Sequence, residues 1–375
     1  TETHISISLH SQPPWGKLEA IAQQLHVFLA TKHHSASARE REGRGRKGKH
    51  NESEHTDEEA RQQLNNSTQF WQRPLAGSVR ERRFTTKVTT TVTSWISDME
   101  NYIVLEPLGS GGFGEVLKCR SLRSGNFFAM KRFFAPDETH HIFQRELAPL
   151  SVLKHDNVIR LLTAFLHGGL MHAIFELLEH SLCDELKKKG CGLESLTIKK
   201  YSFQILRAVD FIHSHNIMHR DIKPDNLLVS RSGVLKLADF GSGRASNHAA
   251  VPLTRAAGTM WFSAPEMLVM DPDYNKPVDV WAVGCTLVFM TTGNYFLKEF
   301  AALPLVHPTT DLMEKYGISD PLLAQLVETC LQMDPVDRWR CSALLRHPYY
   351  TQDHFHESFP KELEKMVDQD QSPSN

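Results

Sequence analysis

A glycine-rich segment constrains the fold of this chain more than any other feature. Four glycines stand within the six positions Gly109 to Gly114 (GSGGFG), between an apolar run at Tyr102 to Leu108 and a second strand-like run at Glu115 to Ser121. In dinucleotide-binding folds such glycines lead from a strand into a helix, whereas here another strand follows. We therefore expect the glycines to close a β-hairpin whose backbone N–H groups can point at phosphates. The chain contains no GxxxxGK[ST] motif, which excludes a Walker-type loop.

The segments that follow change from strand-like to helical patterns. The run Asn126 to Phe133 completes an antiparallel meander, Thr139 to Leu153 has helical periodicity, and two more strand-like runs lie near Val158 and Met171. Beyond them the chain is mostly helical, with long segments at Ile198 to His213 and Val278 to Met290. This order predicts an α+β fold with two lobes: a small antiparallel sheet with one main helix, then a larger, mostly helical lobe.

The first 98 residues differ in amino-acid composition from the rest of the chain. Residues 35–66 are almost free of aromatic and large aliphatic side chains and change from a basic run to an acidic one. Such a segment cannot bury enough apolar surface to fold, so residues 1–98 are predicted to be a disordered extension. The basic run Arg39 to Lys49 is interpreted as a solvated tail, with a localisation signal or a nucleic-acid patch as the alternative.

Composition narrows the classes of partner. The formal net charge is −2, so nucleic acid is not an expected partner. The longest apolar stretch, Val280 to Met290, is far shorter than the roughly 20 residues that span a bilayer, and no membrane association is predicted. The six cysteines show no CxxC pair, which favours free thiols in a reducing compartment over disulfides or zinc. We expect a soluble protein of the cytoplasm, the nucleus or both.

Lys131 and Glu146 form a candidate pair for binding phosphate. Lys131 ends the strand-like run FFAMK, and Glu146 lies in the following helical segment. A lysine held by a glutamate can keep its charge aimed at two phosphates, as phosphoryl transfer requires. Taken alone, a lysine and a glutamate are in most cases ordinary surface residues.

Two later motifs decide between these readings. They are IMHRDIKPDNLL at residues 217–228 and LADFG at residues 237–241. They belong to an ordered series of motifs. The other members are the glycine segment, Lys131, Glu146, the APE at residues 264–266, DVWAVG at 279–284 and Arg338. This series resembles that of the eukaryotic protein kinases, and the resemblance implies a kinase domain over residues 102–350, divided into lobes at 102–177 and 178–350, with a C-terminal tail at 351–375.

The resemblance assigns catalytic roles by residue type. Asp221 would orient the substrate hydroxyl and accept its proton, and Lys223 would neutralise the phosphoryl group in transfer. Asn226 and Asp239 supply the hard oxygen ligands that Mg²⁺ prefers. The implied cofactors are ATP and Mg²⁺, and the implied partners are protein substrates with Ser or Thr acceptors.

The resemblance also implies a nucleotide pocket. Phe175 would gate the adenine site, and Glu176, Leu177 and Leu178 would form the hinge that bonds adenine through the backbone. The full implied set is Leu108, Gly109, Ser110, Gly111, Gly112, Phe113, Gly114, Val116, Ala129, Lys131, Phe175, Glu176, Leu178, Asn226, Leu228 and Asp239.

Several details point to the Ser/Thr kinases and to their cyclin-dependent-kinase-like branch. Lys223 before Pro224 resembles Ser/Thr rather than tyrosine kinases, and the segments MENYIVLEPLGSG and AIFELLEHSLCDEL resemble that branch. Ser263 stands where proline-directed relatives usually carry arginine, which argues against a proline requirement. The helix sequence HHIFQRELAPL lacks the PSTAIRE pattern, so cyclin binding is not expected.

Three further expectations complete the interpretation. Thr254 lies where a phosphate added by an activating kinase could pair with Arg220 and raise activity.

Kinases of this branch often begin with Met-Glu-x-Tyr, so Met99 is a candidate native start. The alternative function is a pseudokinase scaffold that binds nucleotide and partners without catalysis, although Lys131, Asp221 and Asp239, which pseudokinases usually lose, are all present.

Overall fold

The computed structural model describes residues 99–111, 114–134, 142, 146–245, 259–269, 271, 273–296 and 316–371. The predicted extension at 1–98, the hairpin tip Gly112 and Phe113, and Thr254 lie outside the described residues.

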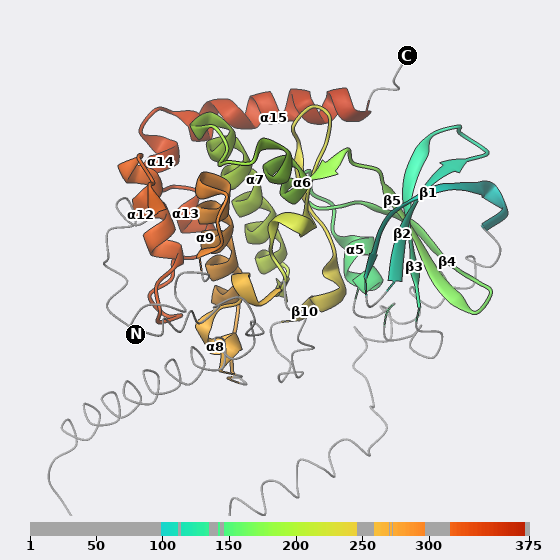
Figure 1. Cartoon of the computed structure of the whole chain (residues 1–375), viewed down its shortest axis with the longest axis horizontal. Helices are drawn as coiled ribbons and strands as arrows, with labels where there is room; N and C mark the ends of the chain where they lie inside the picture. Colours follow the sequence, from blue (N-terminus) through green and yellow to red (C-terminus); the bar gives the residue numbers. More distant parts are fainter. Residues whose placement is uncertain are drawn as a thin grey trace, which may run out of the picture. The chain divides into compact units, whose positions relative to one another are not determined.

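The strand-rich part is a five-stranded antiparallel sheet with the order β1-β2-β3-β5-β4 (Figure 1). The strands are β1 (Tyr102–Gly111), β2 (Gly114–Ser121), β3 (Phe127–Phe133), β4 (Leu161–His167) and β5 (Leu170–Glu176). The predicted meander is confirmed, because β1, β2 and β3 pair consecutively. Burial follows the sheet order: β5 lies inside the sheet and is almost wholly buried, whereas β1 is the exposed edge strand.

One short helix, α5 (Ala148–Val152), lies in the part of the chain between β3 and β4 that is described. The predicted helix Thr139 to Leu153 is therefore described only over its last turns. Its following loop joins the larger lobe: Ile159 N–H donates to Leu237 O at 2.9 Å, and Leu237 N–H donates to Asn157 O at 2.9 Å. These bonds tie the sheet to the strands that carry the catalytic motifs.

The larger lobe is helical, as predicted. Its helices are α6 (Leu182–Lys189), α7 (Ser195–Ser214), α8 (Pro265–Leu268), α9 (Pro277–Thr292), α12 (Pro321–Cys330), α13 (Cys341–Leu344), α14 (Pro348–Thr351) and α15 (Phe355–Gln371). Helix α6 begins with a capping box between Ser181 and Asp184 and ends at Gly190 in the left-handed region, φ 67°.

Helix α9 explains the long apolar stretch of the sequence. Every residue from Val278 to Met290 is buried, so this helix is apolar all round because it lies in the core. A Cβ added at Gly284 would approach Cys330 Cβ to 2.8 Å, so glycine permits the close packing of α9 against α12. Among the described residues, no helix is long and apolar enough to cross a membrane.

Short strands frame the loops with the chemical motifs. β6 (His180–Ser181), β8 (Leu227–Val229) and β9 (Leu235–Leu237) form one small sheet, and β7 (Ile217–Met218) pairs with β10 (Arg244–Ala245). The HRDIKPDN loop connects β7 to β8, and the DFG segment follows β9. Both motifs are thereby fixed at strand ends.

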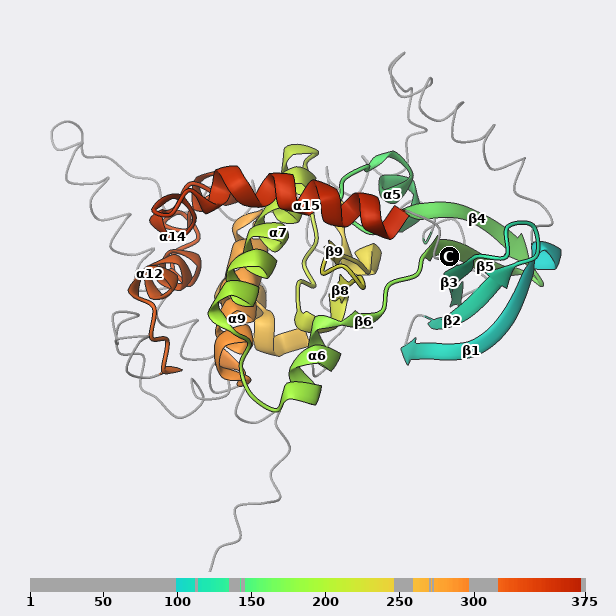
Figure 2. The same ribbon diagram turned by 90° about the horizontal axis from the view of Figure 1, so that it is seen from above.

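The last helix packs on the helical lobe. Figures 1 and 2 show α15 crossing over α7, and the ring centroids of Phe203 and Phe359 lie 5.9 Å apart. Phe355, Phe359 and Leu363 of α15 are buried. Helix α15, which lies in the predicted C-terminal tail, therefore contributes core side chains to the lobe that precedes it.

Candidate active site

Lys131 on β3 joins two carboxylates from distant parts of the chain. Its Nζ lies 2.5 Å from Glu146 Oε1 and 2.9 Å from Asp239 Oδ1. Burial alone would lower the pKa of Lys131, but the two carboxylates outweigh this effect and raise it, so the ammonium stays charged. The predicted Lys131–Glu146 pair is thus present, and a third residue joins it.

The backbone of the DFG segment turns Asp239 toward Lys131. Asp239 has φ 61°, a left-handed conformation that is uncommon for a non-glycine residue and indicates a position fixed by its surroundings. Phe240 is 1% exposed and packs edge-on against His219, with 4.8 Å between ring centroids. Desolvation would raise the pKa of Asp239, but the Lys131 charge holds it below its ordinary value. The carboxylate therefore remains anionic near neutral pH.

Asp279 at the start of α9 fixes the loop that precedes Asp221. Its Oδ2 accepts from the His219 N–H at 2.9 Å and lies 2.8 Å from His213 Nε2, and its Oδ1 accepts from the Arg220 N–H at 2.7 Å. Burial would raise the pKa of Asp279, but these hydrogen bonds and the neighbouring histidines lower it. Arg220 has φ 66°, so the Asp279 bonds hold a backbone turn that would otherwise be strained.

Asp221 lies at the centre of a three-residue cluster. Its Oδ2 accepts from Lys223 Nζ at 2.8 Å and from Asn226 Nδ2 at 2.9 Å, and Asn226 Nδ2 also donates to the Asp221 carbonyl at 2.8 Å. Asp221 Oδ1 is buried and has no hydrogen-bond partner among the described residues. A buried carboxylate oxygen without a donor is costly, so this atom is a ready acceptor for a hydroxyl group.

Asn226 and Asp239 provide the oxygen donors suited to a hard cation. The Ala238 N–H donates to the Asn226 carbonyl at 2.9 Å, which places the catalytic loop beside the residue that precedes Asp239. Within the described part of the chain, no cluster of three or more His, Cys, Asp or Glu side chains has the arrangement of a metal site. A carboxylate and an amide oxygen are donors that would suit Mg²⁺ together with oxygens from nucleotide phosphates.

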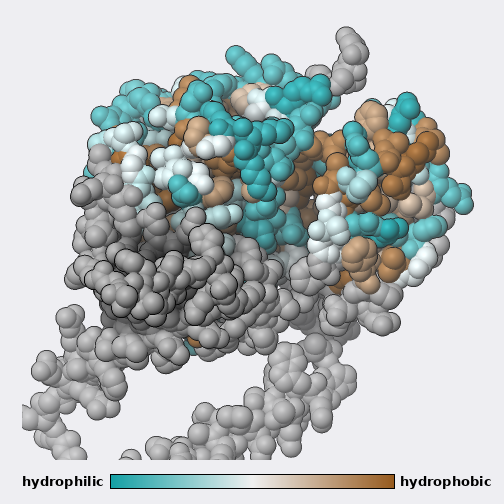
Figure 3. Space-filling model, in the orientation of Figure 1, coloured by the Kyte–Doolittle hydropathy of each residue, from teal (hydrophilic) through white to brown (hydrophobic). Residues whose placement is uncertain are grey.

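The glycine segment does form a hairpin. Gly109 pairs with Val116, Ser110 with Glu115, and Gly111 with Gly114 across β1 and β2. A Cβ at Gly114 would collide with the Arg132 carbonyl oxygen, so the close approach of β2 to β3 requires glycine there. Apolar side chains remain accessible around this hairpin, Leu108 among them, and Figure 3 shows hydrophobic surface over the sheet.

The residues of the implied adenine pocket lie on β2, β3 and β5 of the sheet, on the segment that follows β5 and on β8. Phe175 is 8% exposed on β5 and pairs with Ala129 on β3, while Val116 and Leu228 are half-buried. The Glu176 N–H donates to Arg160 O at 3.3 Å, and the Glu176 side chain pairs with Lys236 Nζ at 3.1 Å. The side chain of Glu176 thus links the two lobes, a role that no local pattern indicated.

Another contact links the APE segment to the end of the domain. Arg338 Nη1 and Nη2 donate to Glu266 Oε1 and Oε2 at 2.5 and 2.8 Å, and both side chains are buried. Asp279 thus fixes the backbone of the catalytic loop, and the Arg338–Glu266 pair fixes the APE segment. Asp279, Glu266 and Arg338 stand in recognisable motifs, but no local pattern indicates their contacts, because their partners lie about 60 and 72 positions away.

The fold and this cluster define a protein kinase. The sequence matches the protein kinase domain family over residues 102–350, and the chain belongs to that family. It is similar to cyclin-dependent kinase-like 2 of Oryctolagus cuniculus, with 36% identity over 307 residues covering 72% of this chain and 54% of that protein. The Homo sapiens counterpart is 35% identical over 307 residues, covering 72% of this chain and 62% of that protein.

A shorter relative is matched over more of its own length. Cyclin-dependent kinase-like 4 of Mus musculus is 32% identical over 291 residues, which cover 67% of this chain and 84% of that protein. The chain spans 54% to 62% of the length of the cyclin-dependent kinase-like 2 proteins cited above. These similarities place it among the cyclin-dependent-kinase-like kinases.

Proposed function

We propose that the chain is an active Ser/Thr protein kinase that transfers the γ-phosphoryl group of ATP to hydroxyl groups of protein substrates. One observation carries this proposal: Asp221 Oδ2 is held by Lys223 and Asn226, while Asp221 Oδ1 is a buried acceptor to which no described residue donates. A carboxylate fixed on one side and open on the other is suited to orient a hydroxyl and accept its proton.

The remaining side chains position the reactants. Lys131, held by Glu146, would bind the nucleotide phosphates, and Lys223 would face the phosphoryl group in transfer. Asn226 and Asp239 would hold Mg²⁺, which supplies neutralisation of phosphate charge when bound. Catalysis would then rest on positioning and on charge, since the protein forms no covalent bond to the substrate.

The nucleotide would lie between the glycine hairpin and the catalytic loop. Gly109, Ser110, Gly111 and Gly114 would cover the phosphates through their backbone N–H groups. Val116, Ala129, Phe175 and Leu228 would enclose the adenine ring, and the hinge from Glu176 to Leu178 would bond its edge.

The competing function is a pseudokinase scaffold. The purified chain with Mg-ATP and a generic basic protein substrate distinguishes the two, with Asp239→Asn as the control. We expect phosphate transfer by the wild type and at least a hundredfold loss in the variant. Transfer no greater than that of Asp239→Asn would support the scaffold instead.

We further propose activation by phosphorylation of Thr254. The Arg220 guanidinium donates to Ser242 O at 2.6 Å and to the Tyr274 hydroxyl at 2.8 Å, which leaves further N–H donors for a phosphate. A phosphothreonine bound there would join the activation segment to the residue next to Asp221. Equal rates for Thr254→Ala and for wild type shown to be phosphorylated at Thr254 would contradict this.

Substrate choice is proposed not to require proline after the acceptor. Ser263 is buried beside Ala264, and its short side chain has no cation to offer at the position where proline-directed relatives carry arginine. A peptide library with all residues at that position tests this, and strong selection of proline would overturn it.

A further inference from the structure

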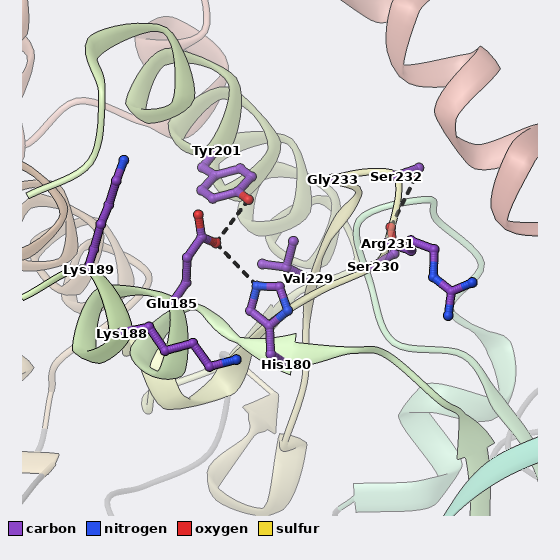
Figure 4. A pocket seen from close by; sticks show the side chains of 10 residues that line it. All are labelled: His180, Glu185, Lys188, Lys189, Tyr201, Val229, Ser230, Arg231, Ser232 and Gly233. Atoms are coloured by element: carbon purple, nitrogen blue, oxygen red, sulfur yellow. Dashed lines mark hydrogen bonds and ion pairs between the residues drawn. The ribbon is translucent and has the colours of Figure 1, made fainter.

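A hollow of about 540 Å³ lies in the helical lobe (Figure 4). Its walls come from β6, α6, α7 and the turn between β8 and β9. None of the described residues that line it belongs to the proposed catalytic or nucleotide-binding set. The hollow therefore has no part in the function proposed so far.

The floor of the hollow is held by specific contacts. Glu185 Oε2 accepts from the Tyr201 hydroxyl at 3.1 Å and lies 3.3 Å from His180 Nε2 (Figure 4). Val229 is 1% exposed and fills the base, and its carbonyl accepts from the Glu179 N–H at 3.1 Å. The lining carboxylate is thus already partnered within the protein.

The turn that forms one wall is also fixed. Gly233 has φ 92°, and the Ser230 carbonyl accepts from its N–H at 3.1 Å. Ser232 Oγ donates to Asp370 Oδ2 of α15 at 2.8 Å. With both ends of this turn tied down, the hollow is a built feature of the lobe.

The charged side chains around the hollow are mainly cationic. Figure 4 shows Lys188 and Lys189 on one side of the His180–Glu185 pair and Arg231 on the other. Arg231 pairs with Glu179 at 2.9 Å and Lys189 with Glu194 at 3.4 Å, but these side chains are exposed. Ion pairs between exposed side chains contribute little to stability, so incoming carboxylates can replace Glu179 and Glu194 as partners. Lys188 forms no ion pair within the described part of the chain.

We propose that this hollow docks an acidic, unphosphorylated linear segment of a protein substrate; the inference rests on the kinase function proposed above. A compact anion in the centre would face the Glu185 carboxylate. An extended segment can instead place separate carboxylates beside Lys188 on one side and Arg231 on the other. Cations at two sides of a partnered acid therefore match a peptide with spaced acidic residues.

Docking in the hollow would raise the local concentration of the acceptor hydroxyl near Asp221 without altering the catalytic side chains. β8 runs from Leu227, next to Asn226 of the catalytic loop, to Val229 at the floor of the hollow, so both sites belong to one lobe. A tethered acceptor would bind through two contacts, which lowers KM. The rate constant kcat would stay unchanged because Asp221 and Lys131 are not involved.

The experiment compares two peptide substrates with the full chain. Both carry the same acceptor sequence, and one adds a Glu/Asp-rich segment through a Gly/Ser linker of about 20 residues, whose mean span is about 25 Å. We expect KM to be about tenfold lower for the acidic substrate, with equal kcat, and the advantage to shrink as salt rises. A substrate with Gln in place of the acids should lose the advantage.

Variants assign the effect to the hollow. The double variant Lys188→Glu/Arg231→Glu should abolish the KM difference but retain turnover of the short substrate. The matched control Arg346→Glu reverses a charge at an exposed position outside the hollow and should keep the KM difference. Equal KM values for both substrates with wild-type enzyme would overturn the docking inference and leave the kinase function standing.

A binding measurement tests docking in the hollow independently of the proposed kinase activity. Fluorescence anisotropy of the labelled acidic segment should report binding to the wild type and at least tenfold weaker binding to the double variant, even if no phosphate transfer occurs. Absence of binding, or binding only to a phosphorylated form of the segment, would overturn the inference.

Discussion

The ammonium of Lys131 lies 2.5 Å from the carboxylate of Glu146, fifteen positions further along the chain. The Glu146 side chain is 6% exposed and that of Lys131 15%, so the pair is largely removed from water. A buried lysine needs such a partner to remain charged. This contact keeps a fixed positive charge on β3, at the position that pairs with Val116 of β2.

Breaking this pair is expected to lower phosphate transfer. We predict that Glu146→Gln and Lys131→Met each reduce kcat/KM for ATP by about a hundredfold or more, because the phosphates lose a positioned charge. Steady-state kinetics at several ATP concentrations measure this. Lys118→Met is the matched control, since Lys118 on the neighbouring strand pairs with the exposed Glu106. An equal loss in the control would argue against a specific role for Lys131.

Much of this arrangement could be predicted from the sequence. Strand periodicity on both sides of Gly109 to Gly114 predicted the hairpin, and the order of the motifs predicted which residues meet. The contacts of Asp279 with the catalytic loop and of Glu176 with Lys236 could not be predicted, because they join segments about 60 positions apart with no local signature. The cationic hollow likewise depends on four elements that only the folded chain brings together.

The Arg338–Glu266 pair is expected to stabilise the larger lobe. Both side chains are almost fully buried, so removing one partner leaves an uncompensated charge. We predict that Arg338→Met lowers the free energy of unfolding by about 3–5 kcal/mol, and that Arg338→Met/Glu266→Leu costs less than the single change. Chemical denaturation of both variants measures this. A double variant less stable than the single one would contradict the explanation.

His155 should make stability depend on pH. Its Nδ1 accepts from the Asn157 N–H at 3.0 Å, and burial together with Arg207 lowers its pKa from 6.5 to about 4. Between these values the unfolded chain binds more protons than the folded one, so stability is complete above about pH 6.5 and falls as the pH drops toward 4. The ring is partly exposed, and we expect a contribution of about 1 kcal/mol between about pH 7 and pH 5.

The variant His155→Asn tests this contribution. An asparagine Oδ1 can still accept from the Asn157 N–H but does not titrate. The other histidines with lowered pKa values, His172, His219 and His347, remain in both proteins. The wild type should therefore lose about 1 kcal/mol more than the variant on acidification, and equal losses would show that His155 does not contribute.

Helix α15 is expected to be part of the folded lobe. Phe359 is 1% exposed and packs against Phe203 of α7 and Phe355. We predict that Phe359→Ala lowers the free energy of unfolding by about 3–5 kcal/mol, whereas Glu364→Ala at an exposed position of the same helix changes it by less than about 0.5 kcal/mol. Thermal and chemical denaturation compare the two. Equal stability of both variants would mean that α15 packs only weakly on α7.

The measurement that tests the central claim most directly compares phosphate transfer by the wild type and Asp221→Asn, with ATP binding measured alongside. Asparagine keeps the shape of the side chain but removes the charge and the second acceptor oxygen. We predict transfer by the wild type, a loss of at least a hundredfold in the variant, and ATP affinity within about twofold of the wild type. Equal transfer rates for the two proteins would contradict the role of Asp221.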